Sequence, residues 1–289
     1  MKILITGASG FIGSNLLRLL SQKNHVYALV RNKKETACTL KVKYLEVDLS
    51  QNDFVKCLPL GIDKVIHLAQ SYRYRDFPDG VEDMVNINLN STVSLLNWAK
   101  KNGVKHFIFS STANVYSQTD EILTEESKTI PNSFYGASKL ASELILAQYK
   151  NFFSVDILRL FTVYGPGQKG MLIPQIIEKI KLKNEIHLSS NIGIKFTPIF
   201  IDDLVLIINK ILLSSDDNGL RIMNVCGNQQ TTLLDVVSEI EKILGVSSST
   251  SITKDKPLNF IGSNELLFSK IDSVNFTDLK NGLNNTILA

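Results

Sequence analysis

No part of this sequence limits the possible folds more than its N-terminal stretch, MKILITGASGFIG. Residues 2–6 are apolar and β-branched enough for a buried parallel strand, and residues 11–20 place apolar side chains on one face of a helix. Between strand and helix, Gly7 allows a tight turn, Gly10 lets a diphosphate approach the backbone, and Gly13 lets the helix pack closely on the strand. Because N–H groups at the start of such a helix point at an anion, the stretch predicts a dinucleotide site.

The spacing of these glycines leaves an alternative open. The first two are three positions apart, whereas the common dinucleotide fingerprint has them two apart. An ordinary strand-to-helix turn would show the same pattern, so other motifs must identify the ligand.

Strand-like and helix-like segments alternate along the rest of the chain. Strands are expected at 26–30, 42–47, 64–69, 105–109, 155–160 and 221–225, helices at 81–101, 133–150, 172–182, 199–213 and 233–244, and a polar loop at 246–251. This alternation predicts an α/β fold with a doubly wound parallel sheet of the Rossmann type. In such a sheet the ligand crevice lies at the carboxyl ends of the strands.

Composition and charge exclude several classes of protein. The net charge of +3 over 289 residues is small and dispersed, so we expect no nucleic-acid partner. No apolar run approaches a membrane span, and the first strand begins too early for a signal peptide, so we expect a cytoplasmic protein with no membrane partner. Cys38, Cys57 and Cys226 share no metal or redox spacing and the four histidines are not paired, so we expect structural histidines and no bound metal.

Tyr135 and Lys139 are the most specific chemical signal in the chain. They lie four residues apart at the front of a predicted helix, so the ammonium and the phenol share one face. A phenol with a pKa of about 10 must be lowered by a few units to act as a base near neutral pH, and each unit corresponds to about 1.4 kcal/mol. Most pairs with this spacing are surface residues, but this pair follows a nucleotide loop and the strand end at 110–112.

Together these motifs resemble the extended short-chain dehydrogenase/reductase family, in particular its NAD-dependent epimerase/dehydratase branch, over nearly the whole chain. The matching segments are 6–13, 48–49, 67–69, 86–92, 135–139, 158–167, 201–204 and 224–227. The resemblance implies that Tyr135 exchanges the proton of a carbinol, that Lys139 lowers its pKa and holds the nicotinamide ribose, and that Thr112 hydrogen-bonds the reacting oxygen.

The resemblance also implies a set of binding residues and a domain division. Cofactor contacts fall on Gly7, Gly10, Phe11, Ile12, Gly13, Arg31, Asp48, Leu49, Leu68, Ala69, Gln70, Asn88, Ser110, Tyr135 and Lys139, and substrate contacts on Thr112, Asn114, Tyr135, Thr162 and Lys195. We expect an NAD(P)-binding domain over 1–165, to which 199–227 returns, and a smaller, mostly C-terminal α/β substrate domain formed by 166–198 and 228–289.

One departure from the family pattern concerns the cofactor. Relatives that use NAD hold its 2′-hydroxyl with a carboxylate after the second strand, where this chain has Arg31 and no acid. Arg31 could accept a 2′-phosphate, which favours NADP, or it could stack on adenine in an enzyme that uses NAD.

Other departures concern the reaction and the substrate. Family dehydratases carry an acidic pair after the catalytic threonine, and Ala113 and Asn114 stand there instead, so dehydration is not expected. Nucleotide-sugar enzymes have Asn at the position of Thr162 and Arg at that of Phe196. Lys195 could take the place of this arginine, but an ammonium lacks the planar, forked geometry of a guanidinium.

These features predict an NAD(P)-dependent 4-keto reductase or 4-epimerase of a sugar, in the first place a nucleoside-diphosphate sugar of surface-polysaccharide biosynthesis. Two alternatives stay open: a reductase of a small non-nucleotide carbonyl, of the dihydroflavonol-reductase-like kind, and a dinucleotide-sensing protein without turnover. Family relatives often dimerise through helices that correspond to 81–101 and 133–150, so a homodimer is also expected.

Overall fold

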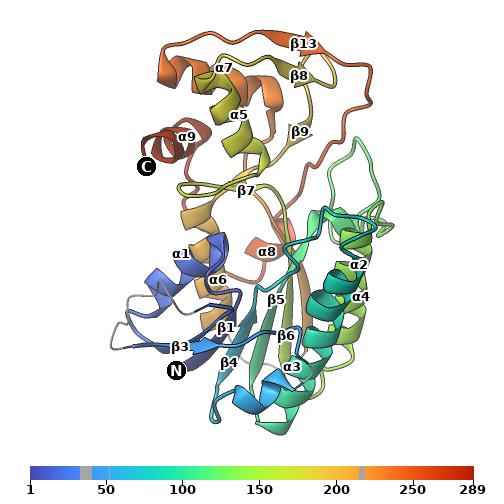
Figure 1. Ribbon diagram of the computed structural model, residues 1–289, viewed down its shortest axis with the longest axis vertical. Coiled ribbons are helices and arrows are strands. Elements are labelled where there is room, and N and C mark those ends of the chain that lie inside the picture. Colours follow the sequence, from blue (N-terminus) through green and yellow to red (C-terminus); the bar gives the residue numbers. More distant parts are fainter. Residues whose placement is uncertain (33–40, 52, 215–218) are drawn as a thin grey trace. The chain divides into compact units, whose positions relative to one another are not determined.

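The computed structural model describes residues 1–32, 41–51, 53–214 and 219–289, and the chain divides into two compact units (Figure 1). Unit 1 comprises 1–117, 128–159 and 208–223, and unit 2 comprises 118–127, 160–207 and 224–289. Cys38 lies outside the described residues. The segment 118–127 lies in unit 2, where the Leu123 N–H donates to the carbonyl of Ile261 (2.7 Å) and the Leu123 carbonyl accepts from the Asn224 amide (3.0 Å).

A seven-stranded sheet forms the centre of unit 1. Its strands are β1 (Lys2–Thr6), β2 (His25–Val30), β3 (Val42–Glu46), β4 (Lys64–His67), β5 (His106–Thr112), β6 (Ser154–Leu160) and β11 (Leu220–Val225), in the order β3-β2-β1-β4-β5-β6-β11. Strand β1 runs parallel to both β2 and β4, and the pairs β2–β3 and β4–β5 are also parallel. The strand order therefore reverses beside β1, which confirms the predicted doubly wound sheet and places its crevice at the carboxyl ends of β1 and β4.

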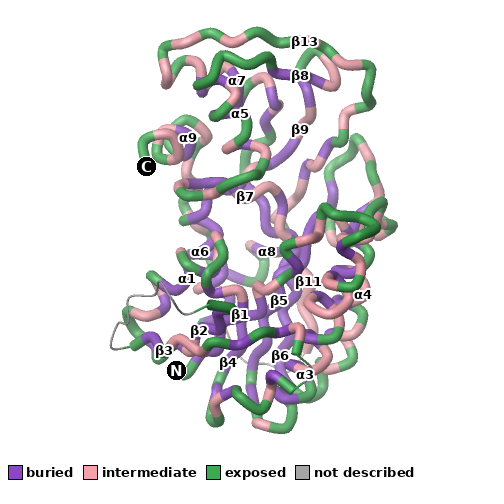
Figure 2. Tube along the Cα trace, in the orientation of Figure 1, coloured by how far each residue is buried: buried purple, intermediate pink, exposed green. Residues whose placement is uncertain are grey.

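Helices cover both faces of this sheet. Helix α1 (Phe11–Leu20) lies on one side, and α2 (Val81–Met84), α3 (Ser91–Lys101) and α4 (Phe134–Ala147) lie on the other (Figure 1). The apolar side chains between the sheet and α3 and α4 form a continuous core that includes Leu4, Val65, Leu95, Leu96, Phe107, Leu146 and Phe153. Figure 2 shows the strands of this sheet as largely buried. Burying one such side chain contributes about 1.5–3 kcal/mol.

The helix expected over 81–101 is interrupted by a π-helical turn, η2 (Val85–Asn90). Two of its carbonyls accept hydrogen bonds from side-chain hydroxyls: Ser91 Oγ donates to Ile87 O (2.6 Å) and Thr92 Oγ1 donates to Asn88 O (2.7 Å). The Ser142 hydroxyl of α4 also donates to Asn88 O, at 2.8 Å. Hydroxyl groups inserted into the helical ladder in this way widen a turn, and apolar periodicity does not reveal them.

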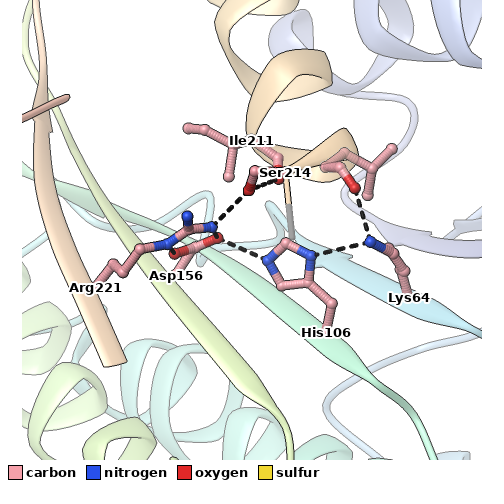
Figure 3. A network of polar contacts seen from close by, with 7 residues as sticks. Lys64, His106, Asp156, Ile211, Ser214 and Arg221 are labelled. Atoms are coloured by element: carbon pink, nitrogen blue, oxygen red, sulfur yellow. Dashed lines mark hydrogen bonds and ion pairs between the residues drawn. The ribbon is translucent and has the colours of Figure 1, made fainter. Parts of the chain in front are cut away.

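A buried polar network connects the amino-terminal ends of the strands (Figure 3). Asp156 accepts from His106 Nε2 (2.6 Å), from Arg221 Nε (2.5 Å) and from Arg221 Nη2 (2.6 Å). Lys64 Nζ donates to the carbonyl of Leu212 (2.8 Å) and lies 3.5 Å from His106 Nδ1. His106 thus lies between Lys64 and Asp156, and its ring connects the two.

Unit 2 contains short strand pairs and helices. Its elements are β7 (Val163–Tyr164), α5 (Leu172–Lys181), β8 (Ile186–Leu188), β9 (Lys195–Phe196), β10 (Ile199–Phe200), β12 (Thr231–Thr232), α7 (Leu233–Leu244), β13 (Thr250–Ile252), α8 (Glu265–Phe268) and α9 (Leu279–Leu288), and α6 (Ile201–Leu213) begins in it. The expected loop over 246–251 is wrong at its end, because Thr250 and Ser251 pair with β8. Pairing across the chain outweighs the polar composition of that segment. Within the described residues, no helix is both long and apolar enough to cross a membrane.

Candidate active site

The loop between β1 and α1 forms a close-packed turn that only glycine permits. Gly7 has a φ of +67°, and a Cβ atom there would lie 2.8 Å from the Ala69 nitrogen. A Cβ atom on Gly13 would lie 2.2 Å from the carbonyl oxygen of Gly7, and the Gly10 N–H donates to that same oxygen at 3.0 Å. The N–H groups of the first turn of α1, from Phe11 on, have no partner within the helix, so the bare backbone of this loop fits a diphosphate.

A buried histidine ties this loop to the neighbouring strand. The Thr6 hydroxyl lies 2.6 Å from His67 Nδ1 and accepts from the Ala69 N–H at 3.1 Å, while His67 Nε2 lies 2.9 Å from the Thr92 hydroxyl. Burial and, to a lesser extent, the charge of Lys139 lower the pKa of His67 to about 3, so the ring is neutral. His67 is structural, and it fixes the turn in which Leu68 and Ala69 lie.

Lys139 is the cation of the site and is fully buried on α4. Its Nζ donates to the carbonyl of Ser110 at 2.6 Å and lies 4.4 Å from the centre of the Phe109 ring. Burial lowers the pKa of Lys139 to about 7, and the negative charge of Glu143 acts in the opposite direction.

Tyr135 lies one helical turn before Lys139 and is half-buried. Its hydroxyl donates to Gln70 Oε1 at 2.9 Å, so two residues of the predicted site, Gln70 and Tyr135, are in contact. Burial raises the pKa of Tyr135 above its usual value, whereas a hydrogen bond with Thr112 lowers it. A base at this position therefore depends on nearby positive charge.

Thr112, the last residue of β5, has a hydroxyl oriented by its neighbour. Its Oγ1 accepts from the backbone N–H of Asn114 (3.2 Å) and from the Asn114 amide (3.1 Å). With both acceptor sites occupied, the O–H of Thr112 is available as a donor. The structure thus places Asn114, a predicted substrate residue, against Thr112.

Asn88 holds two elements of the site together from inside. It is fully buried, accepts from the Ser71 N–H at 2.9 Å and donates to the Ser138 hydroxyl at 2.9 Å. Its side chain therefore fixes the segment after β4 against α4, next to Lys139.

The residues predicted for the adenosine end lie at the carboxyl ends of β2 and β3. Arg31 is exposed, with its guanidinium 5.1 Å from the centre of the Tyr72 ring. Asp48 is exposed and accepts from the N–H (2.9 Å) and hydroxyl (2.8 Å) of Ser50, and these bonds hold its pKa below the usual value. Leu49 is buried in the core.

The two remaining predicted substrate residues, Thr162 and Lys195, are half-buried and belong to unit 2, so they are not part of the cluster within unit 1. Phe196 is fully buried in β9 and pairs with Thr231. Because successive side chains of a strand point to opposite faces, Lys195 points away from the side that Phe196 occupies.

Sequence reasoning missed two neighbours of the catalytic pair. The ring of Tyr74 packs on Tyr135 with 5.0 Å between ring centres, and no sequence signal marks it. Glu143 follows Lys139 by four residues, so helical spacing would have placed it on the same face. Across the described ranges, no three His, Cys, Asp or Glu side chains gather as metal ligands would.

Comparisons with known proteins agree with this geometry. Residues 3–226 match the model of the NAD dependent epimerase/dehydratase family. The chain is 30% identical over 262 residues to YtcB of Bacillus subtilis, named an uncharacterized UDP-glucose epimerase, with 85% of this chain and 83% of that protein covered. It is 28% identical to a UDP-glucuronate 4-epimerase of Thermodesulfobacterium geofontis, with 84% and 80% covered.

A solved structure extends the likeness to the whole fold. The UDP-glucuronic acid 4-epimerase of Bacillus cereus, in complex with UDP-glucuronic acid and NAD, matches with a TM-score of 0.90 at 27% identity. The match covers 99% of this chain and 98% of that one.

Proposed function

The chain belongs to the NAD-dependent epimerase/dehydratase family, and we propose that it oxidises or reduces one carbinol of a nucleoside-diphosphate sugar, as a 4-epimerase or a 4-keto reductase. The observation that carries this proposal is the cluster of Thr112, at the carboxyl end of β5, with Tyr135 and Lys139 of α4. The glycine loop follows the carboxyl end of β1 in the same sheet. The named activities of YtcB and of the two UDP-glucuronate 4-epimerases support it.

The roles of the side chains follow from their contacts. A bound nicotinamide would supply the hydride acceptor or donor. Tyr135 takes the hydroxyl proton of the carbinol when the sugar is oxidised and returns it when a ketone is reduced. The Lys139 ammonium favours the phenolate, and the Thr112 hydroxyl donates to the reacting oxygen, for which Asn114 has oriented it.

Dehydration does not fit the positions that follow Thr112. Ala113 has no proton to exchange and is buried, and the amide of Asn114 is held by the threonine oxygen. Neither side chain can move the protons that elimination of water requires.

The experiment that tests the proposal combines the purified protein with UDP-glucose, UDP-glucuronic acid and the corresponding 4-keto sugars. NMR would follow the configuration at carbon 4, and absorbance would follow the nicotinamide. We expect turnover in the protein and a loss of about 10²–10⁴-fold in Tyr135→Phe. Unchanged turnover in that variant would rule out the assigned chemistry.

A second candidate substrate class is favoured by Phe196. Because this fully buried side chain occupies the position of the family arginine, a diphosphate group loses one expected partner. A reductase of small non-nucleotide carbonyls would reduce such compounds without any nucleotide-sugar turnover. The dinucleotide-sensing alternative would show binding and no turnover with either class.

We further propose that Arg31 makes the protein prefer NADP over NAD, because Arg31 and Asn32, and no acidic residue, come directly after β2, where a carboxylate would hold a 2′-hydroxyl. Both cofactors would be titrated into the protein and into Arg31→Ala. Loss of NADP affinity alone supports the proposal. Tightly retained NAD in the protein as purified would contradict it and would favour an epimerase that recycles its cofactor, and NAD is what the Bacillus cereus structure contains.

We also propose that the protein is a homodimer and that it is cytoplasmic. On the outer face of α4, Leu144 is 64% exposed, and on the outer face of α3 and η2, Val93 and Leu89 are half-buried, as a homodimer through these helices would require. Light scattering should show a dimer that Leu144→Glu weakens. Cys57 and Cys226 are free, which suits the reducing cytoplasm, where nucleotide sugars for surface polysaccharides are made.

A further inference from the structure

Helix α4 presents three functional groups on one face, each one turn after the last: the Tyr135 phenol, the Lys139 ammonium and the Glu143 carboxylate. Three successive residues at the end of β5 meet them. The Thr112 side chain lowers the pKa of Tyr135, the Ser110 carbonyl accepts from Lys139 at 2.6 Å, and the Ser111 hydroxyl donates to Glu143 Oε1.

Glu143 is held on several sides although it is almost inaccessible to water, with 3% of its surface exposed. Arg159 donates from Nε to both carboxylate oxygens, at 3.1 and 3.2 Å, and from Nη2 to Oε2 at 2.7 Å. Arg159 Nη1 donates in turn to the Tyr116 hydroxyl at 3.0 Å. A carboxylate that accepts this many hydrogen bonds, three of them from a guanidinium, is fixed in place.

The surroundings of Lys139 make this carboxylate significant. The Ser110 carbonyl and the Phe109 ring of β5 offer partial negative charge, and His67 of β4 is neutral. Tyr135 and Glu143 of α4 are the titratable neighbours on its own helix. Glu143 is the group whose full negative charge raises the pKa of Lys139, against the burial that lowers it to about 7.

We propose that Glu143, clamped by Arg159 and Ser111, is a positioning residue that keeps Lys139 protonated and thereby keeps Tyr135 usable as a base. The proposal deepens the proposed function and rests on it for the part that concerns turnover. The electrostatic part concerns Lys139 alone and can be measured without substrate or cofactor.

The test uses the full-length protein with carbon-13 at the ε carbon of its lysines and follows each signal by NMR from pH 5 to 11. Lys139 is the lysine that titrates near neutral pH and whose signal disappears in Lys139→Met. In Glu143→Gln we expect its pKa to fall by about one unit or more, because the ammonium loses the charge that favours it.

Glu143→Gln also leaves the Arg159 guanidinium buried without its carboxylate, which can weaken the fold. A double variant, Glu143→Gln with Arg159→Met, removes both charges and relieves this. In the double variant we expect the Lys139 pKa to lie between its value in Glu143→Gln and its value in the unchanged protein. In Glu143→Asp, which keeps a negative charge, we expect the Lys139 pKa to return most of the way to the value in the unchanged protein. A double variant that titrates like the unchanged protein would overturn the proposal and leave Glu143 a purely structural role.

Turnover gives the second readout. If the proposed function holds, the pH at which kcat is half-maximal should shift in the double variant, while KM changes little. A shifted Lys139 pKa in a protein that turns over no carbinol would refute the proposed function and leave the electrostatic assignment standing. An unshifted Lys139 pKa in an enzyme that turns over the sugar would support the proposed function and overturn the electrostatic assignment.

Discussion

At the scale of single residues, the site depends on hydrogen bonds that leave one donor or one charge available. Thr112 accepts twice from Asn114 and so keeps its own proton for a ligand. Lys139 directs its ammonium to the Ser110 carbonyl and follows Tyr135 by one helical turn. Each group is useful because a neighbour has already satisfied its other bonding capacity.

The first prediction concerns Thr112. Thr112→Val removes the hydroxyl while keeping the shape, so kcat should fall by about 10²–10³-fold with little change in KM, as for other lost donors to a reacting oxygen. Thr112→Ser keeps the hydroxyl and should retain most activity. Steady-state kinetics at several pH values would check this, and equal activity in the valine and serine variants would contradict the role of the hydroxyl.

From the sequence we predict chemical roles for these residues, and those roles stay predictions, but the sequence does not reveal the contacts that the residues make. Tyr135, Lys139 and Thr112 were identifiable from spacing and resemblance. In contrast, the packing of Tyr74 on Tyr135 and the hold of Arg159 on Glu143 join residues far apart in the chain, which no local pattern encodes. The resemblance to the epimerase/dehydratase family, on which the site assignments rested, is confirmed.

At the scale of elements, glycine loop and helix α1 act as one rigid piece. Gly13→Ala would force a methyl group to within 2.2 Å of the Gly7 carbonyl oxygen, so loop and helix must move apart. We expect a loss of about 1–3 kcal/mol in the free energy of unfolding, typical of overpacking, and at least tenfold weaker dinucleotide binding. Ser14→Ala, on the exposed side of the same helix, is the control. Calorimetric titration and urea melts would measure both, and normal binding in Gly13→Ala would argue against the loop as the diphosphate site.

The amino-terminal ends of β4, β5, β6 and β11 depend on Asp156. Burial raises its pKa, but hydrogen bonds from His106 and Arg221 outweigh that effect and hold it below the usual value. A depressed folded-state pKa stabilises the protein above the unfolded pKa of about 4, and that stability is lost as the pH falls through the folded value.

Asp156→Asn should therefore cost about 3–5 kcal/mol of unfolding free energy at neutral pH, because it removes the buried carboxylate that accepts from both His106 and Arg221. The variant should also lose part of the decline in stability that the unchanged protein shows below pH 4. Asp53→Asn, which breaks a pair with Lys56 on the exposed surface, should have little effect. Urea unfolding at pH 7 and at pH 3 would decide, and equal losses in the two variants would contradict the structural importance of the network.

Element bounds were predictable where local signals are strong. Helices α1 and α7 have the expected bounds; α7 starts with a capping box between Thr232 and Asp235 and stops before Gly245, whose φ is +66°. The π-helical turn and β13 were not foreseen, because hydroxyl-to-carbonyl bonds and strand pairing set them.

At the scale of the whole molecule, the two units interleave along the chain. Unit 1 needs three separate segments and includes residues up to 223. The expected domain division, with a late segment that returns to the first domain, stays a prediction. In the structure, 118–127 is bonded to several residues of unit 2, among them Ile261 and Asn224. That unit 2 binds substrate stays a prediction.

A fragment ending at residue 165 should therefore fail to fold stably. It lacks Leu220 and Ile222, which pack against the core, and Arg221, which holds Asp156. Circular dichroism during urea titration should show no cooperative transition for this fragment, in contrast to the full chain. A sharp transition would mean that the first strands form a self-sufficient unit.

The position of β11 in the sequence also determines when the sheet can be completed during biosynthesis. On the ribosome, the sheet lacks its last strand until residues 220–225 have emerged, although the glycine loop that opens the chain was made first. Throughout that interval the edge of β6 that β11 will cover is open to foreign strands, and Asp156 lacks its arginine. The nascent protein thus carries a complete glycine loop while its central sheet is still unfinished.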